Sequence, residues 1–314
     1  MRRVRGVRGV RGVALMLVLW LIVVLGAIAV GVAALSRGEA GIVDNVRTRA
    51  AARYAAESGI VAATWRLKQL LRAAETPRDQ ALLFRRLDRV LADLQQETIG
   101  ATQFQVTVVD LNARVDLNAA DEPTLLAFFG QFVSAREAQS LVDALQDWKD
   151  ADDDPRPQGA EAADYARAGS PFRPPNRPLQ RLDELTRIKG FSDSLADRIA
   201  PFVTVQGDGR VNLNTAPVPV LASLPGFDPA SAADLAAQRE HGAVFTSLTE
   251  LARRRGRDFS QLTTMPHRVL FISRGWQVGP PRPLTHEIQA VYDLDAVRLS
   301  QPRLILRFWR EFDR

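Results

Sequence analysis

The stretch VALMLVLWLIVVLGAIAVGVAAL, residues 13–35, decides how this chain is organised. It runs for 23 residues without a charge, and a helix of about 20 apolar residues crosses the ~30 Å hydrocarbon core of a bilayer. Residues 1–12 hold five arginines and no acid, so we expect the N-terminus in the cytoplasm and the bulk of the chain across the membrane. A secretory signal peptide is the alternative, but its apolar core normally has about 7–15 residues.

Composition excludes several function classes. The formal charge of the 314-residue chain is +5, but without residues 1–12 it has 36 basic and 36 acidic residues. A neutral remainder lacks the broad basic surface typical of nucleic-acid binding. The chain has no cysteine, which excludes disulfides, thiolate metal sites and cysteine nucleophiles. Its length makes two or more lobes plausible.

The remaining periodicity predicts a helical block between strands. Helical spacing continues past the apolar run to about Leu71, and a second helical patch covers 79–96. Alternation predicts strands at 103–110, 269–278, 285–294 and 303–309. Because strands flank the helical segments, we expect an α+β fold in which a β-sheet head contains a large all-helical insertion.

A repeat marks the insertion. Val115-Asp116-Leu117-Asn118-Ala119-Ala120 recurs as Val211-Asn212-Leu213-Asn214-Thr215-Ala216. A helical segment is expected after each copy, at 123–129 and at 217–223, and a further helix–turn–helix at 182–202. The repeat therefore predicts two related helical modules.

The second module resembles a helix-hairpin-helix, carried by Leu224-Pro225-Gly226-Phe227-Asp228 and the helical segment 230–240. With the preceding NLNTAP it also resembles bacterial DNA-uptake receptors. DNA-binding versions usually read Gly-Ile-Gly, and their backbone N–H groups hold a phosphate. Here Asp228 replaces the second glycine, and a solvated helix end explains the basic cluster at 253–257 as well as DNA does. We therefore expect packing and protein contacts and keep a membrane-anchored DNA-binding receptor as the alternative.

The N-terminus resembles the leader of a type IV pilin-like precursor. Gly12 follows basic residues and borders the apolar run, so a prepilin peptidase would cut after it and leave Val13 as the first mature residue. Gly6 and Gly9 are formal alternatives, and an uncleaved signal anchor is another. Ordinary pilins carry Glu at mature position 5, whereas this chain has Leu17. A buried charge needs a partner in the membrane, and a subunit with no neighbour above it has none.

This departure narrows the resemblance to the protein K family of type II secretion, the large minor pseudopilins. The supporting motifs are 11–15, the acidic 147–152, Gly159-Ala160-Glu161 with Tyr165, and 211–217. The resemblance implies a single-pass inner-membrane protein with a methylated N-terminus and a fold of SAM-like or helix-hairpin-helix modules inserted in a pilin-like head. It implies a protein that caps the pseudopilus tip in the periplasm and helps start its assembly for export of folded proteins. The implied partners are other minor pseudopilins, the prepilin peptidase and the inner-membrane secretion platform.

An acidic loop suggests a metal site. Asp150, Asp152, Asp154 and Glu161 have the spacing of EF-hand positions 1, 3, 5 and 12, but Pro155 stands where the sharp turn needs Gly. A true EF-hand is therefore not expected. Clustered carboxylates still suit Ca²⁺, and the family resemblance implies calcium here. The first candidate ligands are Asp150, Asp152 and Glu161, followed by Asp147, Asp153 and Asp154. A solvated acidic loop is the alternative.

No catalytic motif emerges, so we expect no enzyme. His241, His267 and His286 are scattered, and neither a Gly-rich phosphate loop nor a Gly-x-Ser-x-Gly elbow occurs. The expected organisation is a leader (1–12), a transmembrane and filament-core helix (13–37), a pilin-like helix with the first strand (38–114), a first helical module with the acidic loop (115–207), a second helical module (208–265) and the C-terminal β part of the head (266–314).

Overall fold

The computed structural model describes residues 10–87, 91, 94, 97–249, 260–279, 283–295 and 302–314, and of 10–13 and 33–42 the backbone only. Its α-helices are α1 (Val10–Ala73), α2 (Pro77–Arg85), α4 (Glu122–Phe129), α5 (Ala135–Lys149), α6 (Ala162–Arg167), α7 (Asp193–Ile199), α8 (Val218–Leu221) and α9 (Pro229–Glu240). Its 3-10 turns are η2 (Leu111–Ala113), η3 (Leu182–Arg187) and η4 (Ala200–Phe202). Its strands are β1 (Glu97–Ile99), β2 (Thr102–Asp110), β3 (Val115–Asp116), β4 (Val203–Thr204), β5 (Val211–Asn212), β6 (Leu262–Thr263), β7 (Arg268–Gln277), β8 (Thr285–Asp295) and β9 (Arg303–Asp313).

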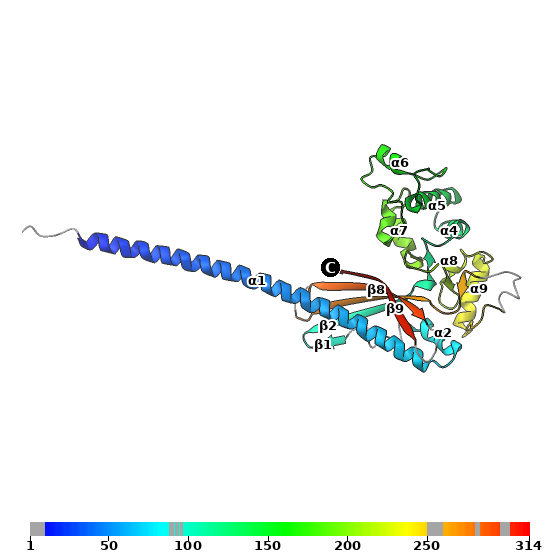
Figure 1. Ribbon diagram of the computed structural model, residues 1–314, viewed down its shortest axis with the longest axis horizontal. Coiled ribbons are helices and arrows are strands. Elements are labelled where there is room, and N and C mark those ends of the chain that lie inside the picture. The colour runs from blue at the N-terminus through cyan, green and yellow to red at the C-terminus, as the bar shows by residue number, and fades with distance from the viewer. Residues whose placement is uncertain are drawn as a thin grey trace, which may run out of the picture.

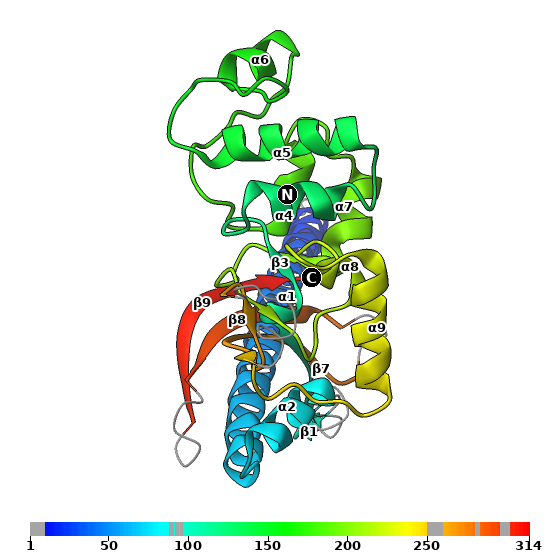
Figure 2. The same cartoon turned by 90° about the vertical axis from the view of Figure 1, so that its right-hand side faces the viewer.

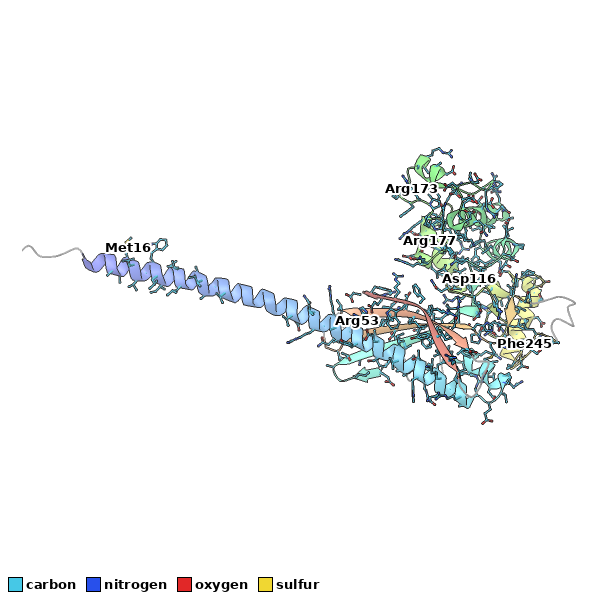
Figure 3. The ribbon with its side chains drawn as sticks, viewed as in Figure 1. Met16, Arg53, Asp116, Arg173, Arg177 and Phe245 are labelled. Carbon is cyan, nitrogen blue, oxygen red and sulfur yellow. The ribbon has the colours of Figure 1, made fainter. Side chains whose placement is uncertain are left out.

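Helix α1 joins the apolar segment to the head without a break, as the continuing helical spacing predicted. It has 64 residues, and its N-terminal part extends from the head as a long stalk. Met16 lies near the far end, and Arg53 lies where the helix meets the sheet (Figures 1 and 3). Within it Ala14–Val32 is long and apolar enough to cross a membrane, and none of this segment is buried. The structure thus exposes an apolar surface that water does not favour.

The head is α1 packed on one face of a five-stranded antiparallel sheet of order β1-β2-β7-β8-β9. Strands β2 and β7 are neighbours, with Thr102 opposite Gln277 and Asp110 opposite Val269, although the whole helical block separates them in sequence. The expected α+β architecture with an all-helical insertion is therefore confirmed, and Figure 1 shows the block projecting from the head at the end away from the stalk.

Small residues bring α1 very close to the sheet. A Cβ atom on Gly275 of β7 would overlap the backbone of Ala52 and Ala56, and one on Gly59 would overlap the side chain of Ser273. Around this contact Leu67, Phe104 and Phe271 are fully buried. Burying such a side chain contributes roughly 1.5–3 kcal/mol each, so this interface holds the head together.

The sequence repeat is also a structural repeat. β3 pairs in parallel with β4, and β5 pairs in parallel with β6, so each module is closed by a short ribbon between its two ends. Asn118 Nδ2 donates to the carbonyls of Leu179 (2.8 Å) and Val205 (2.9 Å), and its Oδ1 accepts from the Leu179 N–H. Asn214 does the same with Phe245 and Thr264, at 2.7 and 2.9 Å. The shared Leu-Asn pair therefore encodes the closure of each module.

A cation completes each closure. Lys149 Nζ, at the end of α5, donates to the Leu117 carbonyl at 2.8 Å. Arg239 Nη1, near the end of α9, donates to the carbonyls of Leu213 (3.1 Å) and Ala216 (2.8 Å). Both cations thus donate hydrogen bonds to carbonyls in the turn that precedes the first helix of each module.

Three elements differ from their predicted extent. α2 ends at Arg85, and most of the remaining patch up to residue 96 lies outside the described residues. The first half of the 182–202 helix–turn–helix is the 3-10 turn η3 instead of an α-helix. β9 continues to Asp313, beyond the predicted end at Trp309, because it stays paired with β8 as far as His286. Pairing partners far away in sequence decide such ends.

Two separate hydrophobic cores, one in the helical block and one between α1 and the sheet, meet at a polar junction. Asn112 Oδ1 accepts from the N–H groups of His267 (2.7 Å) and Arg268 (3.0 Å), while its Nδ2 donates to Asp208 Oδ1 at 2.6 Å. Asp110, at the end of β2, accepts from the Asn212 side chain at 2.9 Å. Burial raises the pKa of Asp110, and these hydrogen bonds partly offset the shift. The junction fixes the block on the sheet.

Candidate metal centre and membrane anchor

The predicted processing residues lie at the start of α1. Gly12 and Val13 fall in its first turn, where only the backbone is described, and residues 1–9 of the expected leader lie outside the described residues. Leu17 is 66% exposed in the apolar segment. The position that we expect to lie in a filament core thus has an apolar side chain on an apolar helix surface.

The acidic residues cluster between the end of α5 and the start of α6, and we call this cluster the acidic pocket. α5 begins at a capping box formed by Ser134 and Glu137 and ends at Asp150, beyond which the acidic loop starts. Asp147 is fully buried, and its two oxygens accept from the Arg156 N–H at 3.3 and 3.2 Å. Gly159 lies against this carboxylate so closely that any Cβ there would overlap it. The sequence Gly159-Ala160-Glu161 thus closes over Asp147.

Glu161 has no hydrogen-bond partner for its carboxylate. It is 3% exposed, and both side-chain oxygens are buried without a hydrogen bond, as is Oδ1 of Asp150. Unpaired buried carboxylate oxygens are costly and demand an explanation such as a bound ion. These buried carboxylate oxygens of Glu161 and Asp150 therefore lack a hydrogen-bond donor, and a bound cation would stabilise them.

The pKa values of the clustered carboxyl groups agree with this geometry. Burial, followed by the charges of Asp147, Asp150, Asp153 and Asp152, raises the pKa of Glu161 from 4.5 to about 7. Burial also raises the pKa values of Asp147 and Asp150. Arg156 lies beside the cluster, with its Nε 4.0 Å from Asp147 while its Nη1 pairs with Glu122 at 3.0 Å. The charges of Arg156 and Lys149 favour ionised Asp150, but burial and the charge of Asp152 still raise its pKa.

The other predicted ligands lie on the exposed side of the loop. Asp152 Oδ1 accepts from the Asp154 N–H at 3.0 Å, and Asp153 Oδ1 accepts from Asn176 Nδ2 at 3.1 Å. As the side chains stand, the described part of the chain holds no group of three His, Asp or Glu residues arranged to bind a metal. The structure therefore brings Asp147, Asp150 and Glu161 toward one pocket and leaves Asp152, Asp153 and Asp154 at its rim.

One residue that supports the pocket was missed from the sequence. Asp143 is 3% exposed, and its Oδ2 accepts from the Gln158 N–H at 3.0 Å, which ties the loop to α5. It precedes Asp147 by one helical turn on the same face. The four-residue spacing of Asp143 and Asp147 was the signal in the sequence that could have identified Asp143.

The helix-hairpin-helix turn is already capped by its own carboxylate. Asp228 is the N-cap of α9, and its Oδ1 accepts from the Ser231 N–H at 2.6 Å. This is the helix N-terminus at which a phosphate would bind in a DNA-binding hairpin. The four arginines at 253–257 lie outside the described residues. A carboxylate at this position repels a phosphate backbone.

The three histidines occupy unrelated places. His267 Nδ1 lies 3.1 Å from Asp208 at the polar junction, and His286 Nδ1 lies 2.8 Å from Asp313 beside the sheet edge. His241 Nδ1 lies 2.8 Å from the Ala237 carbonyl at the end of α9. Each has a local structural partner.

Taken together, a long helix with an exposed apolar half, packed on an antiparallel sheet, defines the class: a pilin-like protein with an inserted helical block. Residues 108–208 match the model of the family "Type II secretion system (T2SS), protein K", and residues 206–261 match the helix-hairpin-helix motif. The expected resemblance to type II secretion system protein K is therefore confirmed, and the first helical module carries most of it.

Similar proteins and a solved structure support the same resemblance. The chain is 39% identical over 99 residues to type II secretion system protein K of Pseudomonas aeruginosa, covering 31% of this chain and 29% of that protein. It is 29% identical over 134 residues to the Klebsiella pneumoniae protein, covering 38% and 41%. These matches thus span less than half of either relative. A chain in the crystal structure of the GspK–GspI–GspJ complex from enterotoxigenic Escherichia coli has the same fold, with a TM-score of 0.60, 17% identity and coverage of 83% and 95%.

Without metal, the pocket should make the protein less stable as the pH rises. The folded-state pKa of Glu161 is raised from 4.5 to about 7, so its favourable protonated form is lost as the pH passes through 7. Between about pH 5 and about pH 8, in chelator, we expect the free energy of unfolding to fall by on the order of 2 kcal/mol. Circular dichroism of the detergent-solubilised chain during thermal unfolding measures this change.

Glu161→Gln keeps the shape of the side chain without its charge and should remove most of this pH dependence. Glu240→Gln, an exposed change on α9, serves as the control and should retain it. An equal pH response in the wild type and in Glu161→Gln would contradict the assignment.

Proposed function

We propose that this protein is a minor pseudopilin of a type II secretion system, anchored in the inner membrane by one helix with its bulk in the periplasm. In this role it caps the tip of the pseudopilus and helps start its assembly for export of folded proteins. The observation that carries the proposal is the continuous helix α1, apolar and exposed at one end and packed on the head at the other. The role is structural and involves no catalysis.

Steric bulk supports placement at the tip. The helical block projects sideways from the part of the head that lies away from the apolar stalk, as Figures 1 and 2 show. In a filament whose stalks pack side by side, a subunit placed above this one would meet that block. The chain then terminates the filament on that side.

The start of α1 supports the same role. Cleavage after Gly12 by a prepilin peptidase would leave Val13–Leu35 attached as the helix that packs first in the bilayer and then in the filament core. Leu17 offers no carboxylate to the amine of a subunit above. A subunit at the tip has no such amine to meet, so Leu17 avoids an uncompensated buried charge.

Gly12→Ala should block leader removal and stop secretion by the type II system. Intact mass of the membrane-extracted protein measures loss of residues 1–12, with or without methylation of Val13. Secretion is measured as the activity of an exported enzyme in the medium, which we expect to fall at least tenfold. Gly6→Ala and Gly9→Ala, in the same Arg-Gly-Val repeats, are matched controls that should be cut normally. Normal secretion with an uncut leader would contradict the pilin-like role.

The outer face of α1 supports packing against other minor pseudopilins. On the side of the helix away from the sheet, Val46, Tyr54, Val61 and Trp65 are 62%, 67%, 67% and 60% exposed. They follow each other at helical spacing and form an apolar stripe next to no described part of this chain. Such a stripe is typical of a seam between helices.

Trp65→Glu should weaken assembly with the other minor pseudopilins of the same system. A charge in a buried helix seam is unfavourable, so we expect at least a tenfold loss of co-purification from detergent extracts. Trp65→Phe keeps an apolar ring and should retain most of the binding. Unchanged circular dichroism shows that both variants fold, and full co-purification of Trp65→Glu would exclude this face.

We further propose that the acidic pocket holds a structural Ca²⁺. The donor set fits, because Glu161 and Asp150 present buried oxygens without partners and Ca²⁺ prefers oxygen ligands. Asp147, Asp150 and Glu161 would hold the ion, with Asp152, Asp153 and Asp154 available from the rim. The ion would neutralise the acids and fix the Pro-rich loop on α5.

Calcium should raise the unfolding temperature of the wild type by several degrees at about pH 8, where Glu161 is charged. Saturating ligand at about 100 times its Kd stabilises a fold by about 2.7 kcal/mol. Thermal unfolding with calcium, with magnesium and with chelator measures the effect. Glu161→Gln should lose most of the calcium response and Glu240→Gln should keep it. The same response in all three proteins would place any bound calcium elsewhere.

The alternative, a membrane-anchored DNA-binding receptor, is favoured only by the helix-hairpin-helix match at 206–261. Asp228 caps the relevant helix end with a negative charge, and the chain beyond residue 12 is neutral. Both observations disfavour phosphate contacts. We therefore assign the hairpins to packing and protein contacts.

A further inference from the structure

The face of the sheet opposite α1 is only partly covered. Alternate residues of β7 point to α1 and are buried, whereas Leu270 and Ile272 point the other way and stay half-exposed. Val291, Phe308 and Phe312 of β8 and β9 continue the same apolar surface. This floor belongs to neither of the two hydrophobic cores.

The first helical module lies over this apolar surface of the sheet, and a groove separates the two. The groove has a volume of about 430 Å³, and residues 180–183 and 204–206 form its other wall. The groove reaches β9. This strand is the last of the sheet and lies at its edge in Figure 2. Every residue that lines the groove is among those the structure describes.

The groove carries excess positive charge. Four arginines line it, Arg114, Arg181, Arg310 and Arg314, against the single acid Asp183. Asp183 is paired with Arg181, and Arg314 pairs with Glu287 at 3.0 Å. Arg310 has no ion-pair partner among the described residues and lies over the Phe312 ring, 4.7 Å from its centroid. In a chain that is neutral beyond its leader, this is a local concentration of cations on an apolar floor.

The edge strand beside the groove has an unpaired side. β9 bonds only to β8 in the described sheet, so its other edge exposes backbone N–H and C=O groups. A bulge at Arg307 interrupts its pairing, but from Phe308 to Asp313 the register is regular. Along this part Phe308, Arg310 and Phe312 share the groove face. An edge of this kind can accept an additional strand.

We propose that Phe308–Asp313 of β9 and the adjoining groove bind an extended segment of another protein as a sixth strand, with apolar and acidic side chains alternating on the face toward the groove. Its carboxylate would lie opposite Arg310, and apolar residues two positions before and after it would lie on Phe308 and Phe312. Opposite charges in directly facing positions favour this register. The same arginines would repel a basic strand, which makes the site selective.

Like-charge proximity in the groove supports an acidic occupant. Burial, and then the neighbouring charges of Arg310 and Arg187, lowers the pKa of Arg181. Arg181 comes from the helical module and Arg310 from β9, so the two walls of the groove place like charges near each other, and Asp183 pairs with only the first of them. An acid between them would relieve this repulsion.

Two labelled peptides test the proposal on the detergent-solubilised full chain. The first has the sequence TVTETVTETVT, with valine and glutamate on one face of a strand. The second carries lysine in place of glutamate. Fluorescence anisotropy should show at least tenfold tighter binding of the acidic peptide, with an affinity that weakens as salt is added.

Charge reversal makes the test specific. Arg310→Glu should lose at least tenfold for the acidic peptide and gain affinity for the lysine peptide. Arg303→Glu, on the same strand but outside the groove, should leave both affinities unchanged. Equal binding of the two peptides by the wild type, or an unchanged preference in Arg310→Glu, would overturn the proposal. The arginines would then serve only to keep other strands from pairing with β9. Unaltered unfolding temperatures show that both variants fold.

Discussion

The close contact between α1 and the sheet is the constraint on which the rest of the structure depends. Gly275 leaves room for the backbone of Ala52 and Ala56, so the helix lies directly on β7. This contact lets one helix carry the exposed apolar segment at one end and form one side of the head core at the other. It also leaves the opposite face of the sheet available for the helical block and the groove.

The helical block is held as a separate unit with its own core. Its two modules use the same closure, in which Asn118 or Asn214, near the start of a module, bonds to an interior segment and to the module's end. Hydrogen bonds from Asn112 to Asp208 and from Asn212 to Asp110 then fix the block to the sheet. Because these polar links are buried and satisfied, the block has one defined orientation instead of hanging from a flexible linker. A defined orientation is what a capping role requires.

The prediction from sequence succeeded where the signal was local. The period of the residues after Leu35 predicted the length of α1, and alternation predicted β2 and β7, since neighbours in sequence carry both patterns. The repeat of 115–120 at 211–216 predicted two related modules. The acidic spacing pointed to this cluster, and the order of its candidate ligands stays a prediction. Asp147 is fully buried on the packed face of α5, whereas Asp152 is exposed in the loop that follows this helix.

By itself, the sequence determined an apolar segment long enough to cross a membrane, the inserted order of elements, the absence of cysteine chemistry and the resemblance to protein K. Only the tertiary structure decided that Glu161 is buried without a partner, that Gly275 meets α1, and that Arg181 and Arg310 face one groove. The physical reason is distance along the chain. Helical periods and apolar runs are properties of adjacent residues, whereas burial, pKa and charge clustering depend on which remote segments pack together.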